Sequence, residues 1–246
     1  FIEDYMPKPD LRRLIILTGA RQTGKTTLSR YKYPHLNYIN LDSPENRDLL
    51  KSISSASWAK SVGNAIIDEA QKEPVVFEKV KYAYDDGGIS FCLMLGSSQI
   101  LLLKKIRESL AGRVSIYELW PLMMSELYWD ADSKHIKPPL IDRFFSKENF
   151  NNIFNDVSEV LLDKIDQKYH EAESHLLQLG GMPALLSLPD SERWKWLKDY
   201  EYTYLERDLA DLARLDDLGP FRTFQKLSAL RSGKLLNYSE LARDAS

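Results

Sequence analysis

The sequence is poor in cysteine, with Cys92 as the single example among 246 residues. One cysteine cannot form an intrachain disulfide, and it leaves no CxxC pair for a metal site. Cys92 lies in the apolar run Phe91–Leu95, where we interpret it as a small core residue. The four histidines do not pair at i, i+4 spacing, so they predict no metal site. The lack of a disulfide framework fits a cytoplasmic location.

Long apolar runs and a strong net charge are missing too. No apolar run reaches the roughly 18 residues that a membrane-spanning helix needs, so we expect no membrane segment. The formal net charge is -3, which gives no overall attraction for nucleic acid, so any such contact must be local. The segment Phe1–Asp4 has no initiator methionine and no secretory signal pattern, so we expect the chain to begin inside a longer gene product.

Short apolar runs alternate with amphipathic stretches in the first half of the chain. This pattern is typical of a parallel sheet with helices on both faces, an α/β fold. The expected strands cover residues 14–17, 36–41, 65–67, 91–95 and 114–119. A helix is predicted from Lys25 to about Tyr33, where Pro34 ends it.

The rest of the chain differs in composition from this core. We predict three parts: a core over 1–128, an irregular linker with short helices over 129–170, and a helical region over 171–246. In the last part, apolar residues recur at helical spacing from Trp194 to Leu215, and Gly180–Pro183 interrupts the preceding helix.

The segment GARQTGKTT follows the first expected strand and matches the pattern GxxxxGK[ST] at every fixed position. A strand, this loop and a helix together form a P-loop, whose glycines let backbone N–H groups surround phosphate oxygens. The following helix directs its positive end at the same anion. The sequence therefore predicts a site for ATP. The expected nucleotide-binding residues are Gly19, Ala20, Arg21, Gln22, Thr23, Gly24, Lys25, Thr26 and Thr27.

Two side chains of this loop have particular roles. Lys25 is expected to act in catalysis by placing a positive charge on the β and γ phosphates, and a unit charge pair at about 4 Å contributes roughly 4 kcal/mol near a protein surface. Thr26 supplies a hydroxyl to Mg²⁺. A glycine-rich turn needed only for folding is the alternative.

The short apolar strand at 65–67 ends in Asp68 and Glu69. Successive side chains of a strand point to opposite faces, so the two carboxylates can serve different tasks. We expect Asp68 to hold Mg²⁺, mostly through its water shell, and Glu69 to act as the general base that orients the attacking water. An exposed acidic turn is the alternative.

Two further polar residues are candidates for catalysis. Ser97 follows the strand at 91–95 and is expected near the γ-phosphate, although it could instead cap the next helix. Arg113 could neutralise charge on the transferring phosphoryl group, in its own chain or in a neighbouring one. A surface ion pair with a local acid is the alternative for Arg113.

The carboxyl-terminal segment predicts the first two helices of a helix-turn-helix. Phe221–Arg231 forms the first, Gly233 ends it, and Asn237 begins the second with Glu240 at capping-box spacing. Five basic and two acidic residues over 221–246 make DNA a candidate partner. A packing subdomain without DNA contact is the alternative.

These motifs occur in the order found in uncharacterised prokaryotic AAA+-type P-loop ATPases, which the chain resembles from about Leu14 onward. The segments that carry the resemblance are GARQTGKTT, IIDEAQ, LGSSQ, ESLAGR, ELWPLMMSEL, LGGMPALL and YEYTYLERDLADL. It implies a RecA/AAA+-like core, Mg-ATP held by Lys25, Thr26 and Asp68, and a finger-like Arg113. It also implies a winged helix, truncated here, and a nuclease-like domain whose motif is not present.

The sequence is compatible with three functions. The first is an ATPase whose hydrolysis drives a conformational change in a protein or DNA partner, with an oligomer possible. The second is a nucleotide-gated switch with little hydrolysis. The third is a P-loop kinase, which Glu69 argues against because an activated water would waste ATP.

Overall fold

A computed structural model describes residues 6–8, 11–96, 110, 112–127, 140–146, 149–155, 164–204 and 219–245. The chain divides into two compact units, Phe1–Trp194 and Lys195–Ser246. Each unit is considered by itself below. The three-part division predicted from the sequence stays a prediction.

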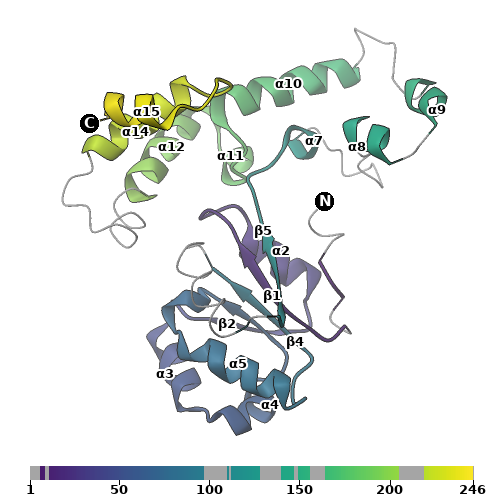
Figure 1. Cartoon of the computed structure of the whole chain (residues 1–246), viewed down its shortest axis with the longest axis vertical. Helices are drawn as coiled ribbons and strands as arrows, with labels where there is room; N and C mark the ends of the chain where they lie inside the picture. Colours follow the sequence, from purple (N-terminus) through teal and green to yellow (C-terminus); the bar gives the residue numbers. More distant parts are fainter. Residues whose placement is uncertain are drawn as a thin grey trace. The chain divides into compact units, whose positions relative to one another are not determined.

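A five-stranded parallel sheet forms the centre of the first unit (Figure 1). The strands are β1 (Arg13–Thr18), β2 (Asn37–Asn40), β3 (Ala65–Asp68), β4 (Phe91–Leu95) and β5 (Val114–Glu118). Every predicted strand is confirmed. β3 and β4 are apolar blocks that are buried along their whole length, and β1 is buried after Arg13, as suits the inner strands of a parallel sheet. The strand order is β2-β3-β4-β1-β5, so β4 lies between β1 and β3.

Helices cover both faces of the sheet, as expected. The helices of this part are α2 (Lys25–Lys32), α3 (Pro44–Ser52), α4 (Trp58–Ser61) and α5 (Val75–Asp85), with 3-10 turns η1 (Ser55–Ser57) and η2 (Ala70–Lys72). One core cluster joins Ile16 and Cys92 to side chains of α3, α4 and α5. The other joins Ile15 and Leu93 to Tyr33 and, from α2, Leu28. The alternation of β1 side chains between the two clusters follows from the pleat of a strand.

Cys92 is completely buried, which confirms its interpretation as a core residue. Burial raises the pKa of its thiol to about 12. The helix α3 is fixed at both ends: the Ser43 hydroxyl accepts from the Asn46 amide, and the buried Lys79 ammonium donates to carbonyls at the carboxyl end of α3. These contacts hold the layer of helices that supports β3.

The first unit continues through further helices after β5. They are α7 (Met124–Leu127), α8 (Leu140–Phe145), α9 (Phe150–Asn155), α10 (Lys164–Leu179) and α11 (Ala184–Ser187), followed by the beginning of α12 (Asp190–Tyr204). α8 and α9 are the short helices expected in the linker. α10 ends just before Gly180, which has φ 77°, as the glycine break predicted.

The second unit contains the end of α12 and the helices α14 (Gly219–Leu230) and α15 (Tyr238–Ala245). α14 and α15 pack against each other. Gly233 has φ 77° between them, and the Asn237 side chain accepts from the Glu240 amide at 3.1 Å, as the capping pattern predicted. Two helices joined by a turn are therefore present, and their identity as part of a helix-turn-helix or winged helix stays a prediction.

Candidate functional site

The loop after β1 has the backbone conformation of a phosphate cradle. Gly19, Gln22 and Gly24 have φ values of 144°, 61° and 94°. Successive left-handed and right-handed residues turn backbone N–H groups toward one concave side. A Cβ atom at Gly19 would lie 2.2 Å from the Leu119 carbonyl oxygen, so glycine is required where the loop passes the end of β5.

Lys25 begins α2 and folds back over this loop. Its ammonium donates to the Gly19 carbonyl at 3.0 Å and to the Ala20 carbonyl at 2.6 Å, and the residue is 7% exposed. A buried cation is stable only with such acceptors. The charge is thus held inside the loop that would surround phosphate.

Thr26 and Asp68 meet across the carboxyl edge of the sheet. The Thr26 hydroxyl donates to Asp68 Oδ2 at 2.6 Å, although 42 residues separate the two in the sequence. Asp68 is 6% exposed at the end of β3, and its Oδ1 accepts from the Glu69 amide at 2.9 Å. The structure therefore brings together the two residues predicted as the Mg²⁺ ligands.

A third side chain at this point was not predicted. Tyr38 on β2 donates its hydroxyl to Asp68 Oδ2 at 2.8 Å, and the Arg30 guanidinium lies 5.1 Å from the centre of its ring. Burial, and then the hydrogen bond to Asp68, raise the pKa of Tyr38. A tyrosine in a strand has no motif around it, so only the pairing of β2 with β3 shows its role.

Glu69 follows Asp68 in a left-handed backbone conformation, with φ 53°. For a residue other than glycine such a conformation costs about 1–3 kcal/mol and is common at functional sites. The Gln71 side-chain amide donates to Glu69 Oε2 at 2.6 Å. The turn takes the Glu69 backbone out of the extended conformation of β3, and different tasks for the two carboxylates stay a prediction.

These residues line a cavity of about 550 Å³. That volume is within the range of small-molecule sites. The lining residues are Arg21, Gln22, Gly24, Lys25, Thr26, Thr27, Asp68, Glu69, Pro183 and Ala184. Pro183 and Ala184 precede and begin α11, and the sequence indicated only a helix break there. The Leu122 amide donates to the Gly181 carbonyl at 2.7 Å, which fixes this segment to the chain that follows β5.

Ser97, one predicted catalytic residue, lies outside the described residues. Another, Arg113, is not among the residues that line this cavity. Arg113 directly precedes β5 and forms an ion pair with Asp85 at 2.6 Å. Because β5 is parallel to β1, the five residues of β5 place Arg113 about 17 Å from the edge that carries the loop. A role for Arg113 at the site of its own chain is inconsistent with this position, and the ion pair agrees with the alternative.

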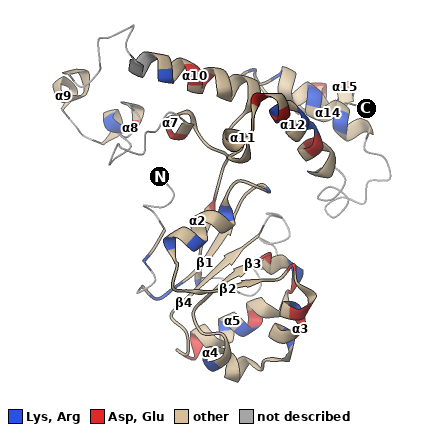
Figure 2. Ribbon diagram, turned by 180° about the vertical axis from the view of Figure 1, so that it is seen from behind, with Lys and Arg blue, Asp and Glu red and all other residues tan. Residues whose placement is uncertain are grey.

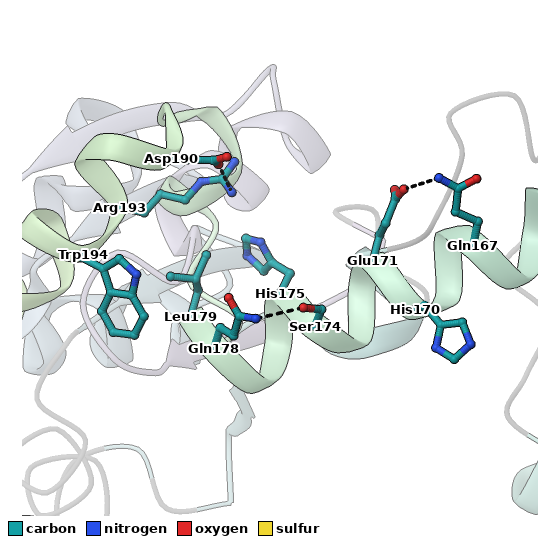
Figure 3. Close-up of a pocket in the computed structure, with 10 residues that line it drawn as sticks. All are labelled: Gln167, His170, Glu171, Ser174, His175, Gln178, Leu179, Asp190, Arg193 and Trp194. Carbon is teal, nitrogen blue, oxygen red and sulfur yellow. Dashed lines mark hydrogen bonds and ion pairs between the residues drawn. The ribbon is translucent and has the colours of Figure 1, made fainter.

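A second hollow of about 710 Å³ lies between α10 and the start of α12 (Figure 3). Arg193 there is held by Asp190 at 2.7 Å and by the Leu188 carbonyl at 3.0 Å. His175 lines the same hollow, and burial, with the nearby Arg193 charge, lowers its pKa. Among the described residues no hydrogen-bond partner is found for His175 Nε2.

The part of the chain that carries the cradle matches a known domain family. Residues 11–128 match the AAA domain family, and residues 170–246 match a domain of unknown function (DUF8612). Residues 11–128 are therefore similar to the AAA domain family, in agreement with the sequence motifs.

The solved Walker-type ATPase paby2304 of Pyrococcus abyssi has the same fold. It is 16% identical, with a TM-score of 0.50 over 96% of this chain and 84% of that chain. An uncharacterized protein of Mycobacterium tuberculosis is 27% identical over 232 residues, and one of Methanocaldococcus jannaschii is 27% identical over 253 residues. Each alignment covers 94% of this chain but 44% and 50% of the relative. The chain thus spans about half the length of these relatives.

The described residues hold neither a membrane-length apolar helix nor a cluster of three His, Cys, Asp or Glu side chains that could bind a metal.

Proposed function

We propose that the chain binds ATP with Mg²⁺ in the cavity at the carboxyl edge of its sheet and hydrolyses the γ-phosphate. The observation that supports this most directly is the 2.6 Å contact between Thr26 and Asp68 beside Lys25. A loop needed only for folding does not require a hydroxyl, a carboxylate and a buried ammonium at one point.

The side-chain oxygen atoms of Thr26 and Asp68 are suitable ligands for magnesium. Thr26 and Asp68 present oxygen atoms, the ligands this hard cation prefers, and a hydroxyl can donate its proton to a carboxylate while offering a lone pair to a cation. When bound, the ion would neutralise charge on the β and γ phosphates. Thr26 would contact it directly and Asp68 through water.

The chain's own residues perform the remaining tasks. The loop amides and Lys25 hold the phosphates, with the ammonium exchanging the Gly19 and Ala20 carbonyls for phosphate oxygens. Glu69 orients a water molecule and accepts its proton as that water attacks the γ-phosphorus, while the bond between this phosphorus and the β–γ bridging oxygen breaks and ADP leaves. Ser97 remains a candidate for contact with the γ-phosphate.

Phosphate release with Mg-ATP tests the proposal. We expect Lys25→Ala to abolish release and Glu69→Gln to lower it by about 10²–10⁴-fold while nucleotide binding persists. Glu78→Gln, at an exposed position of α5, is the matched control and should keep the wild-type rate. If Glu69→Gln released phosphate as fast as wild type, Glu69 could not be the general base.

A nucleotide-gated switch is a second candidate, and the position of α11 favours it. Pro183 and Ala184 line the cavity, so a bound nucleotide would contact the segment that connects α10 to α12. Hydrogen exchange with a non-hydrolysable analogue should then slow in α10 and α11. If ATP in place of the analogue protects Glu69→Gln as strongly as wild type, binding alone produces the change.

The conformational change that ATP hydrolysis would drive requires a partner, which could be DNA, another protein or a second copy of the chain. DNA could contact α14 and α15, where Figure 2 shows both basic and acidic residues. Arg231 there pairs with Glu240 and Asp244, which reduces the charge available to phosphates. A protein partner or a second copy is the alternative, and Arg113 would act on ATP only across such an assembly. Phosphate release measured with and without DNA separates these cases.

A further inference from the structure

Asp68 is oriented by three hydrogen bonds, two of which end on the same oxygen. Oδ2 accepts from Thr26 at 2.6 Å and from Tyr38 at 2.8 Å, while Oδ1 accepts from the Glu69 amide. Thr26 and Glu69 belong to the two motifs that define the site. Tyr38 belongs to neither, and its hydroxyl is an additional donor to the carboxylate.

The position of Tyr38 is itself fixed from two sides. In the sheet, Tyr38 pairs with Ile66, two residues before Asp68 on the adjacent strand β3. Residues two apart on a strand share one face, so the ring extends along β3 to Asp68. Its ring packs against the cluster around Tyr33 and lies under Arg30 of α2, the helix that also carries Thr26. Tyr38 thus connects β2 and α2 to the carboxylate.

Such a contact matters because a carboxylate binds a cation well only in the correct rotation. A neighbouring hydroxyl that bonds to a ligating carboxylate holds this rotation before the ion arrives, and loss of such partners typically lowers metal affinity 10- to 100-fold. Tyr38 has this relation to Asp68, to which its hydroxyl donates.

We propose that Tyr38 is a positioning residue for Mg²⁺: its hydroxyl holds Asp68 in the orientation that binds the ion. This inference rests on the proposed Mg-ATP site. It concerns the Mg²⁺-dependent part of nucleotide binding and not the contacts of the loop with phosphate, which Tyr38 does not make.

Calorimetric titration of a non-hydrolysable ATP analogue tests this, first in EDTA and then over a series of Mg²⁺ concentrations. We expect Tyr38→Phe to raise the Mg²⁺ concentration for half-maximal enhancement of affinity about tenfold or more. Affinity in EDTA should stay at the wild-type value. The matched control is Tyr33→Phe, which removes the same atom from a tyrosine of the same cluster whose hydroxyl donates to the Pro7 carbonyl.

An unchanged Mg²⁺ midpoint in Tyr38→Phe, or a shift equal to that of Tyr33→Phe, would overturn the role of Tyr38. A loss of affinity in EDTA as large as that in Mg²⁺ would also overturn it, because the defect would then be in the fold of the loop. If the wild-type protein binds the analogue in neither condition, the Mg-ATP site itself fails, which is a different result.

Discussion

Neighbouring threonines in the loop allow the contact with Asp68 to be tested one side chain at a time. Thr26 donates to Asp68, whereas Thr27 is exposed. We expect Thr26→Ala to lose the additional rise in unfolding temperature that Mg²⁺ gives over the analogue alone, because the stabilisation by a bound ligand increases with the logarithm of its affinity. Thr27→Ala should keep that rise. Equal rises in both variants would contradict a metal contact at Thr26.

His175 makes stability depend on pH. Its folded pKa lies below the ordinary value of 6.5, through burial and then the Arg193 charge, with Asp190 opposing the shift. As pH falls, His175 therefore takes up its proton in the unfolded chain before it does so in the folded chain. Its contribution to the free energy of unfolding is fully present above about pH 6.5 and decreases as pH falls from there toward the folded pKa.

Chemical unfolding at pH 7.5 and pH 5.5 measures this effect. We expect His175→Gln to lose less stability between the two values than wild type. His35→Gln, at an exposed position, is the control for removal of a histidine. A wild-type protein that loses no more stability between pH 7.5 and pH 5.5 than the variant does would contradict the shift.

At the scale of elements, the connection between α10 and α11 depends on one close approach. A Cβ atom at Gly181 would lie 2.1 Å from the Leu122 carbonyl oxygen, whereas at Gly180 it would meet nothing within 4 Å. Gly181→Ala must therefore displace the segment that carries Pro183. We expect it to weaken analogue binding more than Gly180→Ala, whose cost is backbone strain of about 1–2 kcal/mol. Equal binding by both variants would show that α11 does not contribute to the site.

The sheet was predictable because each strand is a brief apolar block and the loop motif has a fixed spacing. Asp68 was predictable because it ends such a block. Tyr38 and Pro183 were not predictable. Tyr38 reaches the site through the pairing of β2 with β3, and the segment of Pro183 is held by the hydrogen bond between Leu122 and Gly181. Neither contact between distant residues leaves a pattern in the local sequence. Arg113 shows the opposite case: its motif suggested catalysis, but the direction of β5 puts it at the other edge of the sheet.

At the scale of the whole molecule, Cys92 reports on global unfolding. Its thiol is buried in the central strand β4, and its pKa is raised to about 12, so a thiol reagent reaches it only when the sheet opens. A ligand at 100 times its Kd stabilises the folded state by about 2.7 kcal/mol, which corresponds to roughly 100-fold slower labelling. If saturating nucleotide left the labelling rate of Cys92 unchanged, nucleotide binding to the folded first unit would be contradicted.

The most direct measurement is calorimetric binding of Mg²⁺ and the ATP analogue to the wild-type protein and to Lys25→Ala, with exposed Lys60→Ala as control. Two unit charges about 4 Å apart near a protein surface attract each other by roughly 4 kcal/mol. We therefore expect one nucleotide site per chain, and Lys25→Ala should weaken its affinity by about 100-fold or more. Lys60→Ala should bind as wild type does. Absence of binding heat in the wild type, or equal affinity in Lys25→Ala, would contradict a nucleotide site at this loop.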